Sequence, residues 1–264
     1  MKKNVLFIVA VLVLVLGAVG CTKAEENVLK VGATPVPHAE LLELVKADLK
    51  DQGIVLEVVE FTDYVKPNLS LNDGEIDANF FQHVPYLDSF AGERGLELTS
   101  VGTVHVEPLG LYSEKISAVE DLALGAQIAI PSDSVNGGRA LLLLEANGLI
   151  QLKENAGLEA TEKDIIANPK NLTFTPIEAA QLPRVLADVD AAVINGNYAL
   201  EAGLVPTENA LLLEGGQSPY ANILVVKTGD EERKDIAALL AALQTEKVRE
   251  YILETYGGGV VPAF

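Results

Sequence analysis

The sequence predicts an α/β protein made of two lobes. From residue 28 onward, short segments rich in β-branched residues alternate with amphipathic ones, which is the pattern of βαβ units. The same pattern starts again near Ala118, after a stretch of strands without a long helix between them. With 264 residues, of which 49% are hydrophobic, the chain can bury one large core or two ordinary ones, and the restarted pattern favours two.

The first twenty residues are expected to lie outside both lobes. Lys2 and Lys3 precede an uncharged apolar run over residues 5–20, which is short for a bilayer span and typical of an export signal. The run ends in small residues directly before Cys21, the only cysteine in the sequence. Because one cysteine cannot form a disulfide within its own chain, we expect signal cleavage before Cys21 and acylation of that residue, with palmitate for example. Residues 21–27 would form a short polar tether.

The chain is strongly acidic. Without the two lysines of the signal, 17 basic and 38 acidic residues remain, which gives a net charge of −21. This charge argues against nucleic acid as a partner. It also repels anionic lipid headgroups, which suits a soluble body that stands off the membrane on its anchor.

The first lobe is expected over residues 28–112 together with 215–264. Hydrophobic periodicity predicts its strands at 28–33, 54–61, 78–81, 96–106, 109–113 and 223–227. Helical spacing predicts its helices around 41–49, within 62–72, at 84–92 and over 231–256. Pro85 fits the first turn of the third helix, where a missing amide has no partner to lose.

The second lobe is expected over residues 113–214. Its predicted strands are 127–131, 172–176, 191–194 and 210–214. Its predicted helices are a short one from 118, one led in by 132–139, one over 177–188 interrupted by Pro183, and one ending at 202. Asn147-Gly148 is the stop signal of the second of these helices.

Residues 73–87 are the most prominent candidate site. Phe80, Phe81 and Tyr86 place three aromatics in seven residues of a chain with 5% aromatic content, and His83 lies among them. Two interpretations stay open: the aromatics form the core of a buried strand, or the carboxyl end of that strand presents ligand contacts. Both can hold together, and Phe80, one residue out of phase, is then assigned to the core.

A loose internal similarity points to a second wall. Asp77-Ala78, an apolar strand and Gln82-His83 have a counterpart in Asp190-Ala191, an apolar strand and Asn195-Gly196. Chance can produce such a match. Otherwise each half holds a strand whose carboxyl end delivers a polar side chain before a helix, and two such edges would face each other across a cleft.

Two further segments contain candidate polar contacts. In the NGGR segment, Asn136 to Arg139, free amides, a helix dipole and a guanidinium would converge on an anion, and the absence of a P-loop lysine favours a carboxylate over a phosphate. The alternative is a plain turn with a solvated Arg139. Asn222 precedes a strand and could point into a cleft, although a turn asparagine is the simpler explanation of that motif alone.

Patterns that indicate catalysis are missing from the sequence. The three histidines, at positions 38, 83 and 105, lack the spacing of a zinc site, and no serine lies in a nucleophile elbow. Ser132 and Ser134 are explained as helix caps. Carboxylate pairs carry little information in so acidic a chain. We therefore expect neither a catalytic residue nor a bound metal or other cofactor.

Six segments resemble the methionine-binding lipoproteins of bacterial ABC importers, the NlpA-type lipoproteins. They are VGATPVPHAE at 31–40, DYVKPNLSLNDGEIDANFFQHVPYL at 63–87, HVEPLGLYS at 105–113, NGGRALLLLE at 136–145, AAQLPRVLADVDAAVINGNYAL at 179–200 and SPYANILVV at 218–226. The resemblance spans essentially the whole mature chain.

The resemblance implies a type 2 periplasmic-binding-protein fold, with a mixed β-sheet flanked by helices in each lobe and a cleft that closes on L-methionine. It implies that the thioether is surrounded by aromatic residues and that the carboxylate is bound by Arg139. The implied ligand-binding residues are Tyr64, Phe81, His83, Tyr86, Asn136, Arg139, Asn195 and Asn222. Many relatives have asparagine or threonine where this chain has Ser132 to Val135, which leaves the choice of ligand open.

The function expected from this resemblance is that of a monomeric, lipid-anchored binding protein on the extracytoplasmic side. It would deliver methionine to the permease and ATPase of an ABC transporter. Three alternatives remain: a ligand such as a methionine-containing dipeptide or another small amino acid, an acidic surface lipoprotein that acts by protein interaction, and a hydrolase. The second requires an exposed apolar patch, and the third lacks its motif.

Overall fold

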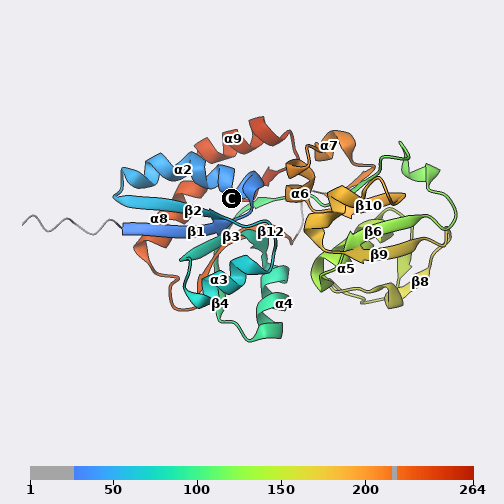
Figure 1. The fold of residues 1–264 in the computed structure, drawn as a ribbon, viewed down its shortest axis with the longest axis horizontal. Coiled ribbons are helices and arrows are strands. Elements are labelled where there is room, and N and C mark those ends of the chain that lie inside the picture. Colours follow the sequence, from blue (N-terminus) through green and yellow to red (C-terminus); the bar gives the residue numbers. More distant parts are fainter. Residues whose placement is uncertain (1–26, 216–218) are drawn as a thin grey trace, which may run out of the picture.

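The computed structural model describes residues 27–215 and 219–264, and its ribbon is drawn in Figure 1. The predicted signal, the predicted lipidation site Cys21 and the tether up to residue 26 lie outside the described residues. Within the described part, no helix is long and apolar enough to cross a membrane.

The first lobe is built on a six-stranded sheet with the order β13-β4-β12-β3-β1-β2. Its strands are β1 (Asn27–Ala33), β2 (Ile54–Glu60), β3 (Ala78–His83), β4 (Leu98–Val106), β12 (Ala221–Lys227) and β13 (Val261–Pro262). Strand β1 is parallel to β2 and β3, whereas β12 runs antiparallel to β3 and β4. The sheet is therefore mixed, as expected.

The second lobe has a five-stranded sheet with the order β11-β5-β10-β6-β9. Its strands are β5 (Gly110–Tyr112), β6 (Gln127–Pro131), β9 (Thr173–Ile177), β10 (Ala191–Ile194) and β11 (Leu212–Leu213), and the short strands β7 (Gln151–Leu152) and β8 (Ile165–Ala167) pair separately. This sheet is mixed too, because β10 is parallel to β6 and antiparallel to β5. Figure 1 shows the two sheets side by side as separate bodies.

One expected lobe boundary is wrong. A boundary after residue 112 assigns β5 to the first lobe, but β5 pairs with β10 and β11 of the second sheet. The chain therefore crosses between the lobes after β4, and it returns between β11 and β12. The apolar pattern of residues 109–113 predicts a strand but not its pairing partner, because pairing depends on tertiary contacts.

Helices cover both faces of each sheet. In the first lobe, α2 (Glu40–Lys50), α8 (Lys234–Leu243) and α9 (Glu246–Tyr256) enclose one core, and α3 (Lys66–Asp73) and α4 (Val84–Arg94) enclose another. In the second lobe the corresponding elements are α5 (Ser134–Ala146) on one face and η4 (Ala179–Val185) with α6 (Gly196–Glu201) on the other. The remaining short helices are η1 (Pro35–Ala39), η2 (Val119–Asp121), η3 (Glu162–Asp164) and α7 (Pro206–Asn209).

Two predicted helices differ in form. The helix expected over 231–256 is two helices, because Thr245 adopts an extended conformation as the N-cap of α9 and ends the run of helical residues. The helix expected over 177–188 is a short 3₁₀ helix, η4, that contains Pro183. Proline has no amide hydrogen, so an α-helical bond to the fourth preceding carbonyl cannot form there.

The internal similarity seen in the sequence corresponds to equivalent positions in the two sheets. The backbone amide of Asp77 donates to the Lys30 carbonyl of β1 at 2.8 Å, and the Asp77 carboxylate accepts the Lys30 amide at 2.8 Å. Asp190 does the same with Gln127 of β6, again with a carboxylate–amide distance of 2.8 Å. Each aspartate thus fixes the start of the strand, β3 or β10, whose other end reaches the gap between the lobes.

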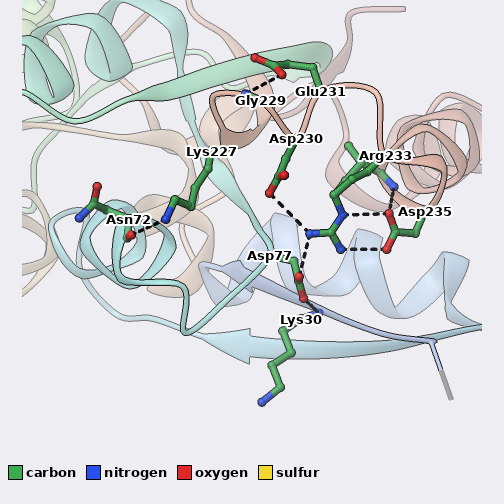
Figure 2. A network of polar contacts seen from close by, with 10 residues as sticks. Lys30, Asn72, Asp77, Lys227, Gly229, Asp230, Glu231, Arg233 and Asp235 are labelled. Carbon is green, nitrogen blue, oxygen red and sulfur yellow. Dashed lines mark hydrogen bonds and ion pairs between the residues drawn. The ribbon is translucent and has the colours of Figure 1, made fainter. Parts of the chain in front are cut away.

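An ion-pair network strengthens this fixation in the first lobe. Figure 2 shows the Arg233 guanidinium between the carboxylates of Asp77, Asp230 and Asp235, at N–O distances of 2.9, 3.6 and 2.9 Å. Arg233 is the N-cap of α8, so the network joins the start of β3 to that helix. It lies at the end of the sheet away from the lobe interface and stabilises the scaffold of the site.

Candidate ligand-binding site

A small cavity lies between the lobes. All eight residues that the sequence predicted for ligand binding line it, together with four that were not predicted: Gln82, Glu107, Gly196 and Asn197. Residues of both lobes therefore meet around one enclosed space, where a small ligand would contact both walls.

Aromatic rings form the wall that belongs to the first lobe. Phe81 and Tyr86 are buried in a cluster with Phe90, and Tyr64 packs against it with ring centroids 5.8 Å from those of both Phe81 and Tyr86. The Tyr86 hydroxyl donates to the Tyr64 carbonyl at 3.0 Å, and the Tyr64 hydroxyl donates to Oδ1 of Asn197 at 2.5 Å. Because both hydroxyls are used in this way, the rings offer mainly apolar surface to the cavity.

Phe80 and Phe81 point to opposite faces of β3. Phe80 is fully buried in the core under α2 and α8, whereas Phe81 lines the cavity. Side chains alternate along a strand, so adjacent residues cannot share a face. The prediction that Phe80 belongs to the core is confirmed.

His83 connects the aromatic wall to the other lobe. It is the N-cap of α4, and its Nδ1 accepts the backbone N–H of Tyr86 at 3.2 Å. Its Nε2 therefore carries the hydrogen and donates to Oδ1 of Asn136 at 3.4 Å. Burial, followed by the charge of Arg139, lowers the pKa of His83 from 6.5 to about 3, so the imidazole is neutral at physiological pH.

The NGGR segment is helix rather than an open turn. Helix α5 begins at Ser134 and is capped by Asp133, whose carboxylate accepts the Asn136 amide at 2.8 Å. The expected set of free amides for an anion is therefore wrong, and neither Ser132 nor Ser134 provides the cap. The glycines instead allow close packing: a Cβ on Gly138 would lie 2.2 Å from the Leu158 carbonyl oxygen.

Arg139 is buried and already bound to a carboxylate of the chain. Its Nε donates to Glu214 at 3.0 Å, its Nη2 forms an ion pair with the same carboxylate, and Nη2 also donates to the Glu107 carbonyl at 2.9 Å. The guanidinium lies 4.1 Å from the ring centroid of Tyr220. The alternative of a solvated Arg139 is thereby excluded, since only 4% of the residue is exposed.

A buried cluster of Glu107 and two histidines lies behind the cavity. The Glu107 carboxylate accepts from Nε2 of His105 at 2.7 Å and from Nε2 of His38 at 3.1 Å. Burial lowers the pKa of His38 to about 4 and that of His105 to about 3. Burial also raises the pKa of Glu107, although His38 and a hydrogen bond from the backbone amide of Asn197 act in the opposite direction. The two imidazoles are thus neutral donors around one carboxylate.

The sequence spacing of the histidines gave no sign of this cluster. The fold forms it by bringing η1, which carries His38, next to the end of β4, which carries His105. The ligand atoms of His38, His105 and Glu107 lie within 4.8 Å of one another, a spacing compatible with a metal ion. Their direct hydrogen bonds to one another account for this close approach.

Asn222 belongs to a strand rather than to a turn. It pairs with His83 of β3 and with His105 of β4, and its Oδ1 lies 3.1 Å from Nε2 of His38. The simpler explanation as a turn asparagine is therefore wrong. Asn222 connects the cavity to the buried cluster behind it.

Two buried side-chain atoms in the cavity wall have no hydrogen-bond partner within the described chain: Oδ1 of Asn195 and Nδ2 of Asn197. The first can only accept a hydrogen bond and the second can only donate one. Buried polar atoms are rarely left unpaired, so these two are the natural contacts for a ligand with one donor group and one acceptor group. Asn195 was predicted from the sequence, whereas Asn197, two residues later, was not.

The other two unpredicted lining residues support the walls. The amide of Gln82 bonds to Asn68 and Asn79 at distances of 2.7 to 3.0 Å and is held within the first lobe. Gly196 lets α6 approach the crossing chain, because a Cβ there would lie 2.8 Å from Cβ of Glu107. Glu107 and Gly196 both occur in segments that carry the family resemblance, but no spacing rule identifies them.

Comparison with known proteins agrees with this geometry. The sequence model of the NlpA lipoprotein family matches residues 29–264. The chain belongs to the NlpA lipoprotein family. The resemblance inferred from the six segments is thereby confirmed.

Individual NlpA relatives cover nearly the whole chain. Membrane lipoprotein TpN32 of Treponema pallidum (strain Nichols) is 48% identical over 248 residues, which cover 94% of this chain and 92% of that protein. D-methionine-binding lipoprotein MetQ of Escherichia coli (strain K12) is 41% identical over 251 residues, which cover 93% of each.

Solved structures of similar proteins share the fold. The nutrient binding protein from Burkholderia cenocepacia, solved bound to methionine, has a TM-score of 0.87 and 45% identity and covers 89% of this chain and 100% of its own. The crystal structure of the methionine binding protein MetQ has a TM-score of 0.87 and 40% identity, with coverages of 91% and 99%. The expected two-lobe substrate-binding fold is therefore confirmed for this NlpA lipoprotein.

Proposed function

We propose that this chain is the substrate-binding lipoprotein of an ABC importer and that it captures methionine in the cavity between its lobes. The observation that carries the proposal is the composition of that cavity: aromatic rings on one side, and an unpartnered buried acceptor and donor on the other. Relatives named for D-methionine binding and a relative solved with methionine support it. A further relative, from Coxiella burnetii, is described as an ABC transporter periplasmic substrate-binding protein, at 45% identity and a TM-score of 0.86.

The aromatic wall suits the thioether side chain. Burial of a methionine side chain contributes about 1.5 to 3 kcal/mol, and sulfur–aromatic contacts add about 0.3 to 1.5 kcal/mol. Micromolar affinity requires about 8 kcal/mol, so apolar contacts alone are too weak. Hydrogen bonds to the charged end of the amino acid must supply the difference.

The polar wall matches an amino acid in charge and in hydrogen-bond direction. Oδ1 of Asn195 would accept from the ammonium, and the buried Glu107 carboxylate adds negative charge on the same wall. Nδ2 of Asn197 would donate to the ligand's carboxylate, and Arg139 supplies positive charge there. Glu214 and the Glu107 carbonyl hold the guanidinium at the edge of the cavity.

Hydrogen bonds between the two walls of the cavity hold the lobes together, and a bound ligand would add to them. Tyr64 bonds to Asn197, and the Tyr198 hydroxyl lies 3.4 Å from the Thr62 carbonyl. A methionine in the cavity would add bonds to both walls and so would stabilise the arrangement in which the walls meet. In this proposal the protein binds and releases its substrate unchanged, without catalysis and without a cofactor.

The membrane anchor and the transport partner are part of the same proposal. Membership of a lipoprotein family supports acylation at Cys21, in keeping with the export signal read from the sequence. The anchored protein would stand as a monomer on the extracytoplasmic side and deliver methionine to a permease and ATPase complex.

Calorimetric titration tests the ligand. Protein stripped of ligand by unfolding and refolding would be titrated with L-methionine, D-methionine, a glycyl-methionine dipeptide and norleucine, which lacks the sulfur. We expect strong heat release with methionine and weaker binding of norleucine. No heat and no thermal shift with millimolar methionine of either hand would refute the ligand assignment, and tighter binding of the dipeptide would correct it.

A further inference from the structure

Asp133 does not line the cavity, yet it is joined to the cavity through one residue. Its carboxylate accepts three bonds from Asn136: from the backbone amide at 2.8 Å and from Nδ2 at 3.0 and 3.1 Å. Asp133 is thus the outer end of a hydrogen-bond chain that runs into the cavity wall.

The first link of this chain has only one direction. An ionised carboxylate accepts hydrogen bonds and cannot donate them. The Asn136 amide must therefore turn its NH₂ group toward Asp133 and its oxygen toward the cavity. That oxygen accepts from Nδ2 of Asn195 at 3.0 Å and from Nε2 of His83 at 3.4 Å.

The other end of this hydrogen-bond chain, at His83, requires the same direction of donation. Nδ1 of His83 accepts from the backbone amide of Tyr86, which can only donate. The hydrogen of the neutral imidazole is therefore on Nε2 and points to Asn136. An acceptor-only group at one end and a donor-only group at the other leave no alternative orientation for the amides between them.

The direction of the chain determines what Asn195 offers to a ligand. Because its Nδ2 is used by Asn136, the atom left in the cavity wall is Oδ1, which is buried and unpartnered. A reversed Asn195 would place an NH₂ group there and would repel a ligand ammonium instead of accepting from it.

We infer that Asp133 is a positioning residue that sets ligand specificity: through Asn136 it turns the Asn195 amide so that the cavity selects a ligand carrying an ammonium group. This inference rests on the proposed function, because it takes the ligand to be an α-amino acid. The selected chemical class is the free amino acid, as opposed to its desamino analogue.

The substitution Asp133→Asn separates positioning from helix capping. Asparagine caps helices about as well as aspartate and has nearly the same size. Its amide, however, places a donor against the Asn136 NH₂ group, and a buried donor without an acceptor is costly. The expected relief is a reversal of Asn136, which brings its NH₂ group against Asn195 and His83.

The test measures a ratio of affinities. Wild type and Asp133→Asn would be titrated with methionine and with 4-(methylthio)butanoate, which lacks only the amino group. We expect the wild type to prefer methionine and the substitution to reduce that preference by about tenfold or more. Asp133→Ser, which keeps a capping oxygen without enforcing the direction, should reduce the preference by a smaller factor and provides a second variant if the first folds poorly.

Asp164→Asn is the matched control. Asp164 also bonds at a helix start, to Thr161, but it does not line the cavity or bond to a residue that does, so its substitution should leave the ratio unchanged. Equal weakening of both ligands by Asp133→Asn would assign Asp133 a merely structural role and overturn the inference. Failure of the proposed function would look different, since the wild type itself would then not bind methionine. In that case NMR of the ligand-free protein still tests the direction of the hydrogen-bond chain, because it shows which ring nitrogen of His83 carries the hydrogen. A hydrogen on Nδ1 would refute the proposed direction.

Discussion

Arg139 and Glu214 form a buried ion pair at the edge of the cavity, with Nε of the arginine 3.0 Å from one carboxylate oxygen. The arginine comes from α5 and the glutamate follows β11, so the pair joins segments 75 residues apart. The guanidinium that the sequence assigned to a ligand is therefore held in place by the chain itself.

Arg139→Ala should weaken methionine binding by a factor of tens or more. The substitution removes the positive charge that we propose for the ligand's carboxylate, and it leaves Glu214 without its partner. Loss of one member of a buried pair typically costs about 3 to 5 kcal/mol, so the melting temperature should fall as well. Calorimetry measures the loss of affinity, and thermal unfolding measures the loss of stability. Glu214→Gln separates the two losses, because it breaks the ion pair but keeps Arg139 and a hydrogen-bond acceptor for it. Unchanged affinity in Arg139→Ala would show that the site is misplaced.

Asn222→Ala should also weaken methionine binding by a factor of tens. The side chain lies between the cavity and His38, and its removal leaves Nε2 of the buried imidazole with Glu107 alone. The loss of a buried partner costs about 1 to 3 kcal/mol. Asn72→Ala is the control, because its amide donates to the neighbouring Asp73 on the surface. Equal affinities of the two variants would contradict the assignment of Asn222.

Phe80→Leu and Phe81→Leu form a matched pair on opposite faces of one strand. Phe80→Leu should lower the unfolding free energy by about 1 kcal/mol through poorer packing and leave affinity nearly unchanged. Phe81→Leu should lower affinity by about three- to tenfold, because an aromatic contact to the ligand is lost. Denaturant unfolding and calorimetry on both variants test the division, and a reversed pattern would refute it.

Acid should weaken the fold through its three buried histidines. Their pKa values in the folded protein are lowered to about 4 for His38 and about 3 for His83 and His105, whereas the unfolded chain keeps the ordinary value of 6.5. Between these values the unfolded state binds more protons, so stability rises with pH and falls on acidification from pH 7. At pH 5.5 each histidine should lower the free energy of unfolding by about 1 kcal/mol relative to its value at pH 7.

The carboxyls with raised pKa, Glu107 and Asp133, act in the opposite sense. The free energy of unfolding would therefore be measured in denaturant at pH 7.5 and 5.5 for the wild type and for His83→Gln. The difference between the two pH values should be smaller for the variant. An NMR titration gives a direct check, and any imidazole that titrates near pH 6.5 would contradict the prediction.

The periodicity of the sequence was sufficient to predict most elements and one wall of the site. Leu41, Leu42, Val45 and Leu49 recur at helical spacing, and all four are fully buried on α2. The alternation at Phe80 and Phe81 predicted which ring faces the core. These features depend on local geometry, which a sequence pattern records directly.

The features that the sequence did not predict depend on tertiary contacts. The partner of β5 is decided by its register with β10, and the helical form of the NGGR segment is decided by Asp133 and by the backbone of Leu158. Glu107 becomes a site residue because η1 and β4 bring two histidines to it. Asn197 becomes one because Tyr64 takes its oxygen and leaves its nitrogen in the cavity.

The two segments that cross between the lobes are bonded to each other and to the same side chain. The backbone amide of Glu214 donates to the Leu109 carbonyl at 2.9 Å, and Arg139 donates to both the Glu214 carboxylate and the Glu107 carbonyl. Because the two crossing segments are tied to each other at this point, a movement of one here should carry the other with it. A ligand that contacted the Arg139 guanidinium would therefore act beside the place where the chain passes between the lobes.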